Sequence, residues 1–203
     1  MNAALSVIGS GLIVILFAGL FCVIGRMLLC KAGIDSDNSC YTLASSYFVG
    51  MAVYLAILRT LTLVTGSYKI VFWSLLILTA VFAVITIYRR FYLWLCKNAG
   101  LLAALVGLWI AHTFHALLYR LIDVERVSLS PYVGIGTIGS LRYAGIADYF
   151  VEQNYIPVLN QSYGQSVLAS FSRLLGLNNL CFALTLWLAV SGAFLCLLLY
   201  SIF

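Results

Sequence analysis

Acidic residues are rare in this chain, and two of them form a closely spaced pair. Asp123 and Glu125 are separated by one residue and are followed directly by Arg126. Carboxylate oxygens bind divalent cations, and a carboxylate can also take the proton from an attacking hydroxyl. The pair therefore predicts a divalent-cation site or a catalytic base. The alternative is a solvated, self-neutralised helix end, because two carboxylates alone leave most coordination positions around a cation unfilled.

Two histidines form a second candidate site. His112 and His115 are three residues apart in an apolar segment, so they share one face of a helix. One of these imidazoles could ligate a haem or a chlorophyll. Zinc sites need three or four protein ligands, and no carboxylate shares this turn. The sequence therefore completes no metal site, and the alternative is a pair of histidines that form hydrogen bonds between membrane helices.

The composition indicates what must position these residues. The chain is 64% hydrophobic and 8% charged, whereas a soluble domain has about 25% charged residues. An integral membrane protein is therefore expected. About 20 apolar residues cross a bilayer as a helix, and five segments qualify: 4–25, 41–64, 70–88, 99–119 and 180–200.

These segments predict an all-α polytopic membrane protein with one external loop. Residues 1–122 form a four-helix transmembrane part, 123–179 the external loop and 180–203 the fifth transmembrane helix. The first segment is read as a retained helix, because it lacks a basic leader and is longer than a signal-peptide core. The loops after the first and third helices are rich in Lys and Arg, which places them in the cytoplasm.

The same rule places the N-terminus and the long loop outside and the C-terminus in the cytoplasm; in a bacterium the membrane would be the inner one. The net charge of +5 does not indicate nucleic-acid binding, because the basic residues are scattered at helix ends rather than gathered in a stripe. Arg59 lies inside the second segment, where a charge costs a few kcal/mol unless it pairs or snorkels. It is a candidate for binding a lipid phosphate, with snorkelling as the alternative.

The external loop has a regular pattern of its own. Apolar residues at helical spacing predict an amphipathic helix over 141–154, with Asp148 and Glu152 on its polar side. Pro157 is expected to end this helix. A second helix is expected from Asn160 or Ser162 to about residue 175. The predicted apolar face contains Tyr143, Ala144, Ala147, Phe150 and Val151.

The stretch RYAGIADYFVEQNYIPVLNQSYGQS, at 142–166, carries a family resemblance. It resembles the first large external loop of GT-C-type membrane glycosyltransferases and related polysaccharide-assembly proteins. In that family an acid-acid-x-R-Y-A-x-I-A helix precedes x-x-x-I-P and a second helix. The resemblance covers about a quarter of the chain, and the matching residues are Arg142, Tyr143, Ala144, Ile146, Ala147, Ile156 and Pro157.

The resemblance implies a glycosyltransferase that uses a polyprenyl-phosphate sugar at the outer membrane face. Asp123, Glu125 and Asp148 would be its candidate catalytic acids. Arg59, Arg126 and Arg142 would bind the lipid phosphate of a lipid-linked saccharide. Family members have more transmembrane helices, so the chain would be an N-terminal piece or a short relative.

A second hypothesis follows from a departure from the family pattern. Gly139 and Ser140 occupy the positions of the family's acids. On this hypothesis the chain is a non-catalytic transmembrane subunit of a larger complex, of photosynthetic or respiratory type, surrounded by lipids and other transmembrane subunits. Aromatic side chains of the loop would then anchor a partner, as they do at many interfaces; the candidates are Tyr143, Phe150, Tyr155 and Tyr163.

Overall fold

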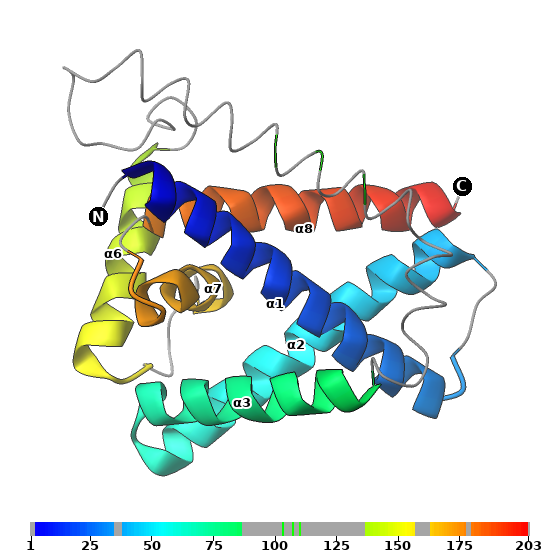
Figure 1. The fold of residues 1–203 in the computed structure, drawn as a ribbon, viewed down its shortest axis with the longest axis horizontal. Coiled ribbons are helices and arrows are strands. Elements are labelled where there is room, and N and C mark those ends of the chain that lie inside the picture. The colour runs from blue at the N-terminus through cyan, green and yellow to red at the C-terminus, as the bar shows by residue number, and fades with distance from the viewer. Residues whose placement is uncertain are drawn as a thin grey trace. The chain divides into compact units, whose positions relative to one another are not determined.

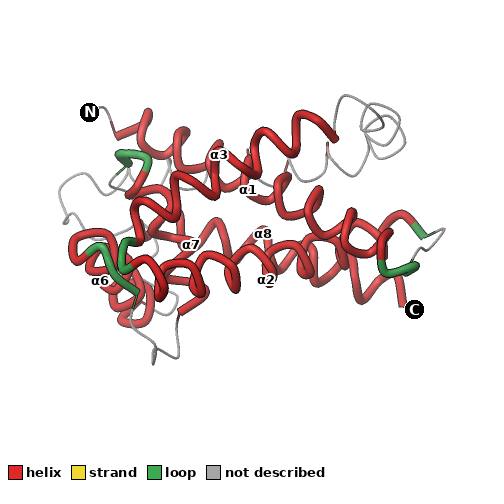
Figure 2. The backbone as a smooth tube through the Cα atoms, turned by 90° about the horizontal axis from the view of Figure 1, so that it is seen from below, coloured by secondary structure: helices red, strands yellow, loops and turns green. Residues whose placement is uncertain are grey.

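The structure is a computed structural model that describes residues 3–34, 38–86, 103, 107, 110, 137–156, 163–177 and 180–202. Within these ranges the chain forms six helices and no strand (Figures 1 and 2). The helices are α1 (Ala3–Lys31), α2 (Ser39–Thr65), α3 (Tyr68–Thr86), α6 (Thr137–Gln153), α7 (Tyr163–Leu174) and α8 (Leu180–Ile202). The predicted all-α class is confirmed for this part of the chain.

Two of these helices are long and apolar enough to cross a membrane, over Ile8–Lys31 and Ser39–Thr65. Two shorter apolar helical stretches, Tyr68–Phe82 and Leu186–Ile202, lie within α3 and α8, which have 19 and 23 residues. The described residues therefore contain two qualifying spans, whereas the sequence predicts five in the whole chain. The predicted fourth span, 99–119, lies outside the described residues apart from three single positions.

Helix α1 differs from its prediction at its C-terminal end. It continues past the expected end at residue 25 to Lys31, so Arg26 lies inside the helix and not in a loop. The chain then turns through Gly33, whose φ of 71° suits glycine, and the Ile34 N–H donates to the Leu29 carbonyl at 3.0 Å. Apolar composition marks where a helix can be buried, but it does not mark the last hydrogen-bonded turn.

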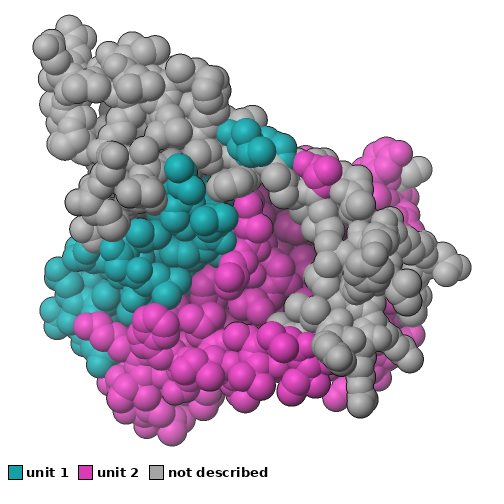
Figure 3. Space-filling model, in the orientation of Figure 1, with its two compact units in different colours: residues 1–14, 106–189 teal, residues 15–105, 190–203 magenta. Residues whose placement is uncertain are grey.

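The chain divides into two compact units (Figure 3). Unit 1 contains residues 1–14 and 106–189, and unit 2 contains residues 15–105 and 190–203. Each unit therefore combines segments that are far apart in the sequence. α6 and α7 belong to unit 1, and α2 and α3 belong to unit 2.

In unit 2, α1 and α2 touch through two glycines. A Cβ atom at Gly25 would overlap the carbonyl oxygen of Ser46 and lie 2.8 Å from the backbone nitrogen of Gly50. A Cβ atom at Gly50 would overlap the carbonyl oxygen of Phe21 and lie 2.9 Å from the backbone nitrogen of Gly25. The two backbones are therefore in direct contact, and glycine is the only residue that permits this approach.

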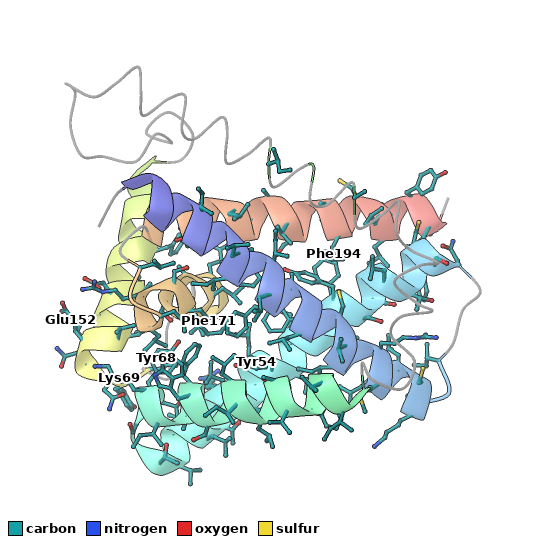
Figure 4. The ribbon with its side chains drawn as sticks, viewed as in Figure 1. Tyr54, Tyr68, Lys69, Glu152, Phe171 and Phe194 are labelled. Carbon is teal, nitrogen blue, oxygen red and sulfur yellow. The ribbon has the colours of Figure 1, made fainter. Side chains whose placement is uncertain are left out.

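The interior of unit 2 is largely aromatic. Phe17 and Phe21 of α1 contact Tyr54 of α2, with ring centroids 6.0 and 5.4 Å apart, and Phe17 also contacts Phe72 of α3 at 6.1 Å. All four side chains are buried, and Tyr54 is labelled in Figure 4. Aromatic pairs at such separations add about 0.5–1.5 kcal/mol each beyond the area that they bury. They join three helices into one core.

Helix α8 joins this core through Tyr47 of α2. The Tyr47 ring stacks on Phe194 with a centroid separation of 4.0 Å and an interplanar angle of 7°. Its hydroxyl shares a hydrogen bond of 2.8 Å with the Ser191 hydroxyl. The phenol is therefore packed and hydrogen-bonded at the same contact, as a buried polar group requires.

The outward surface of α3 is apolar. Beyond Leu75, most of its described side chains are exposed, and the large ones among them are Ile77, Leu78, Val81, Phe82, Val84 and Ile85. By contrast, two hydroxyl groups of α2 are buried inside the unit. Ser46 and Thr62 are buried and donate to the carbonyls of Thr42 and Leu58 at 2.6 and 2.7 Å. The exposed apolar side chains of α3 form a continuous stretch on the surface of unit 2.

Candidate functional site

The polar residues of the predicted loop helices lie on α6 and α7, which pack against each other in unit 1. α6 begins at Thr137, four residues earlier than predicted, so Gly139 and Ser140 fall in its first turn. α7 begins at Tyr163, next to the predicted cap position 162. The term α6–α7 pair is used below for residues 137–156 and 163–177.

Helix α6 ends in a residue with the left-handed conformation, a few positions before Pro157, which was predicted to end the helix. Asn154 has φ of 53°, and the Tyr155 N–H donates to the Phe150 carbonyl at 3.3 Å. This hydrogen bond closes the last turn, and asparagine tolerates the left-handed conformation better than most residues do. Pro157 lies outside the described residues, so its predicted role is not needed to explain this helix end.

The predicted apolar face of α6 is packed inside the chain. Ala147 and Phe150 are fully buried, and Val151 is nearly so. Ala147 forms a small core with Ala169 of α7 and Leu184 of α8, against which the partly buried Tyr143 packs. The helical spacing therefore predicted the burial of Ala147, Phe150 and Val151 correctly, whereas the side chain of Ala144 lies outside the described set.

An ion pair closes the α6–α7 pair at its polar edge. Arg173, in the last turn of α7, donates from Nε to Oδ1 of Asp148 on α6 at 2.8 Å. The two side chains are 33% and 38% exposed, respectively. Exposed pairs of this kind contribute about 0.2–1 kcal/mol, so this one fixes the register of two helices more than it stabilises the fold. Asp148 is the one candidate catalytic acid that the structure describes, and its carboxylate is thus paired with the guanidinium of Arg173.

Helix α7 is enclosed over most of its length. Every side chain from Ser166 to Ser172 is buried, and Leu177 after the helix lies against Gly9 of α1. The Ser170 hydroxyl donates to the Val167 carbonyl at 2.7 Å. The hydroxyls of Ser166 and Ser172 are buried without a hydrogen bond to the described residues. The middle of α7 is thus enclosed by the rest of the chain.

The aromatic residues predicted to anchor a partner have different environments. Phe150 is fully buried within this chain, so in this structure it offers no surface to a partner. Tyr143 is partly buried, and Tyr155 is 41% exposed. Tyr163 begins α7, but its side chain is outside the described set.

Two exposed residues on the outward side of α6 were not singled out as partner contacts from the sequence. Tyr149 is 53% exposed, and Glu152 points away from the helix into the open (Figure 4). Both follow Asp148 within one turn, on the polar side of the predicted helix. The sequence therefore contained an indication of a contact surface here, since an aromatic residue on a polar helix face is a common feature of such surfaces.

Several predicted site residues lie outside the described residues or have undescribed side chains. The catalytic, metal-binding and cofactor predictions for Asp123, Glu125, Arg126, His112 and His115 fall in undescribed parts of the chain. Arg142 lies in α6, and nothing is described of its side chain. Among the described residues no group of three His, Cys, Asp or Glu could hold a metal ion. The predicted cation and haem or chlorophyll sites stay predictions.

Arg59 lies within α2, six residues before its end at Thr65, and its side chain is partly buried. Six residues correspond to about 9 Å along the helix. Snorkelling to the headgroups and binding of a lipid phosphate are the two interpretations of a guanidinium at this position. Phosphate binding by Arg59 stays a prediction.

Comparison of the chain with known protein families, with curated proteins and with solved structures finds no match.

Proposed function

We propose that this chain is an integral membrane protein that serves as a non-catalytic subunit of a larger membrane assembly. In this proposal unit 2 is embedded among lipids, and the α6–α7 pair presents its outward side to a neighbouring subunit. The observation that carries the proposal is the ion pair between Asp148 and Arg173. In this ion pair Asp148, a candidate catalytic acid, helps to hold two helices together, which is a structural role.

The membrane location is supported by the surface of unit 2. Branched aliphatic residues are exposed along α3, whereas the hydroxyls of Ser46, Thr62 and Tyr47 form hydrogen bonds within the unit. In a hydrocarbon solvent this arrangement is favourable, because apolar side chains lose nothing on exposure and polar groups must bond internally. In water the same surface would lead to aggregation.

Residues at the helix ends of unit 2 fit the two bilayer interfaces. Lys69 and Trp73 are exposed near the turn between α2 and α3, and Lys31 and Tyr200 are exposed at the ends of α1 and α8. Tryptophan, tyrosine and lysine are typical of the headgroup region. We propose five spans in total, with the N-terminus and residues 123–179 outside and the C-terminus in the cytoplasm.

Labelling of single cysteines tests this topology. Cys30 near the end of α1 is exposed and free. In sealed right-side-out vesicles an impermeant maleimide should leave Cys30 unlabelled until the membrane is opened. In a variant without other accessible thiols, Glu152→Cys should be labelled at once. Labelling of both positions, or of neither, in sealed vesicles would rule out the proposed sidedness.

Site-specific cross-linking tests the docking role. A photoreactive amino acid at Tyr149 or Tyr155 should give one discrete heteromeric product in native membranes, with the same partner from both positions. The control is the same amino acid at Val81 on the apolar face of α3, where lipid is the expected neighbour. Recovery of a functional isolated monomer, without cross-links from either tyrosine position, would exclude a subunit role.

A second candidate function, glycosyl transfer from a lipid-linked saccharide, is favoured by one observation. The RYAGIA motif lies within a single helix, which ends before Ile156 and is followed by a second helix. This helix–break–helix order is the one that the GT-C resemblance implies. Asp123→Asn and Glu125→Gln should then abolish glycan transfer while leaving the amount of folded protein unchanged; wild-type transfer in both variants would exclude these acids from catalysis.

A further inference from the structure

We draw no further inference here: the strongest candidate, the exposed apolar surface patch on the C-terminal half of α3 from Ile77 to Ile85, carries nothing beyond the proposed membrane location, because nothing in the structure shows whether lipid, a second copy or a partner helix covers it.

Discussion

Gly25 and Gly50 bring the backbones of α1 and α2 into contact, and each glycine is opposed by a carbonyl oxygen of the other helix. The carbonyls belong to Ser46 and Phe21, each four residues before the glycine of its own helix. The contact is therefore reciprocal. Such an approach allows Cα–H groups to face carbonyl oxygens, an interaction worth about 0.5–1 kcal/mol.

The first prediction concerns this crossing. Gly25→Ala and Gly50→Ala should each destabilise the protein, because a methyl group would overlap a backbone carbonyl that cannot move aside. Overpacking of this kind costs about 1–3 kcal/mol or more. Unfolding in detergent micelles, followed by circular dichroism, measures the loss. Gly19→Ala is the matched control in α1, since a Cβ there meets nothing within 4 Å; equal stability of all three variants would contradict the crossing.

The contact between Gly25 and Gly50 also shows which feature of the fold could not be predicted from the sequence. Gly19 and Gly25 lie in the same apolar helix, and no property of the sequence separates the exposed one from the one in contact. The positions of α1, α2, α3 and α8 could be predicted, because long apolar runs are a local signal. Which faces meet depends on the packing of whole helices, which local spacing does not encode.

The second prediction concerns Asn38, which precedes α2. Its Oδ1 accepts from the backbone N–H groups of Cys40 and Tyr41 at 3.0 and 3.2 Å, and its Nδ2 donates to the Ser201 carbonyl at 3.4 Å. Asn38→Ala removes all three bonds and should cost about 0.5–2 kcal/mol. Asn38→Asp keeps the acceptor and loses only the long donor bond, so it should retain most of the stability.

Thermal unfolding of these two variants beside the wild type separates the capping bonds from the link to α8. If Asn38→Asp were as destabilised as Asn38→Ala, the bond to Ser201 would be the important one and the capping role would be refuted. The sequence did not reveal this role. The apolar segment from which α2 was predicted begins at residue 41, after the capping asparagine.

The third prediction concerns Tyr47. Tyr47→Phe removes the hydrogen bond to Ser191 but keeps the ring stacked on Phe194, so the loss should be small. Hydrogen bonds between membrane helices average about 0.6 kcal/mol. Tyr47→Leu also removes the ring contact and should cost clearly more, by the additional 0.5–1.5 kcal/mol or so of an aromatic pair. Equal losses in chemical unfolding experiments would show that stacking contributes nothing here.

In the α6–α7 pair, too, some features could be predicted from the local spacing of residues, whereas others depend on the packing between helices. The spacing of Ala147, Phe150 and Val151 predicted a buried face, and all three side chains are buried. The partner of Asp148 could not be predicted, because Arg173 is 25 residues away on another helix. Phe150 was expected to contact a partner, yet it belongs to the chain's own core, since a hydrophobic face in an isolated pattern does not reveal what covers it.

The fourth prediction separates a structural role of Asp148 from a catalytic one. Asp148→Arg and Arg173→Asp should each weaken the α6–α7 pair, because each places two like charges opposite one another. The double variant restores opposite charges at the same positions. A structural role therefore predicts that the double variant regains the proteolytic resistance of α6 and α7, together with cross-linking from Tyr149 to its partner.

A catalytic role predicts a different pattern for the same variants. Glycan transfer, measured with a lipid-linked saccharide donor, would be lost in Asp148→Arg and would stay lost in the double variant, because the carboxylate has moved to another helix. Asp148→Asn is a milder control, since it removes the charge and keeps the size. Recovery of folding and partner cross-linking in the double variant, without any glycan transfer by the wild type, is the outcome expected from a subunit whose ion pair only joins two helices.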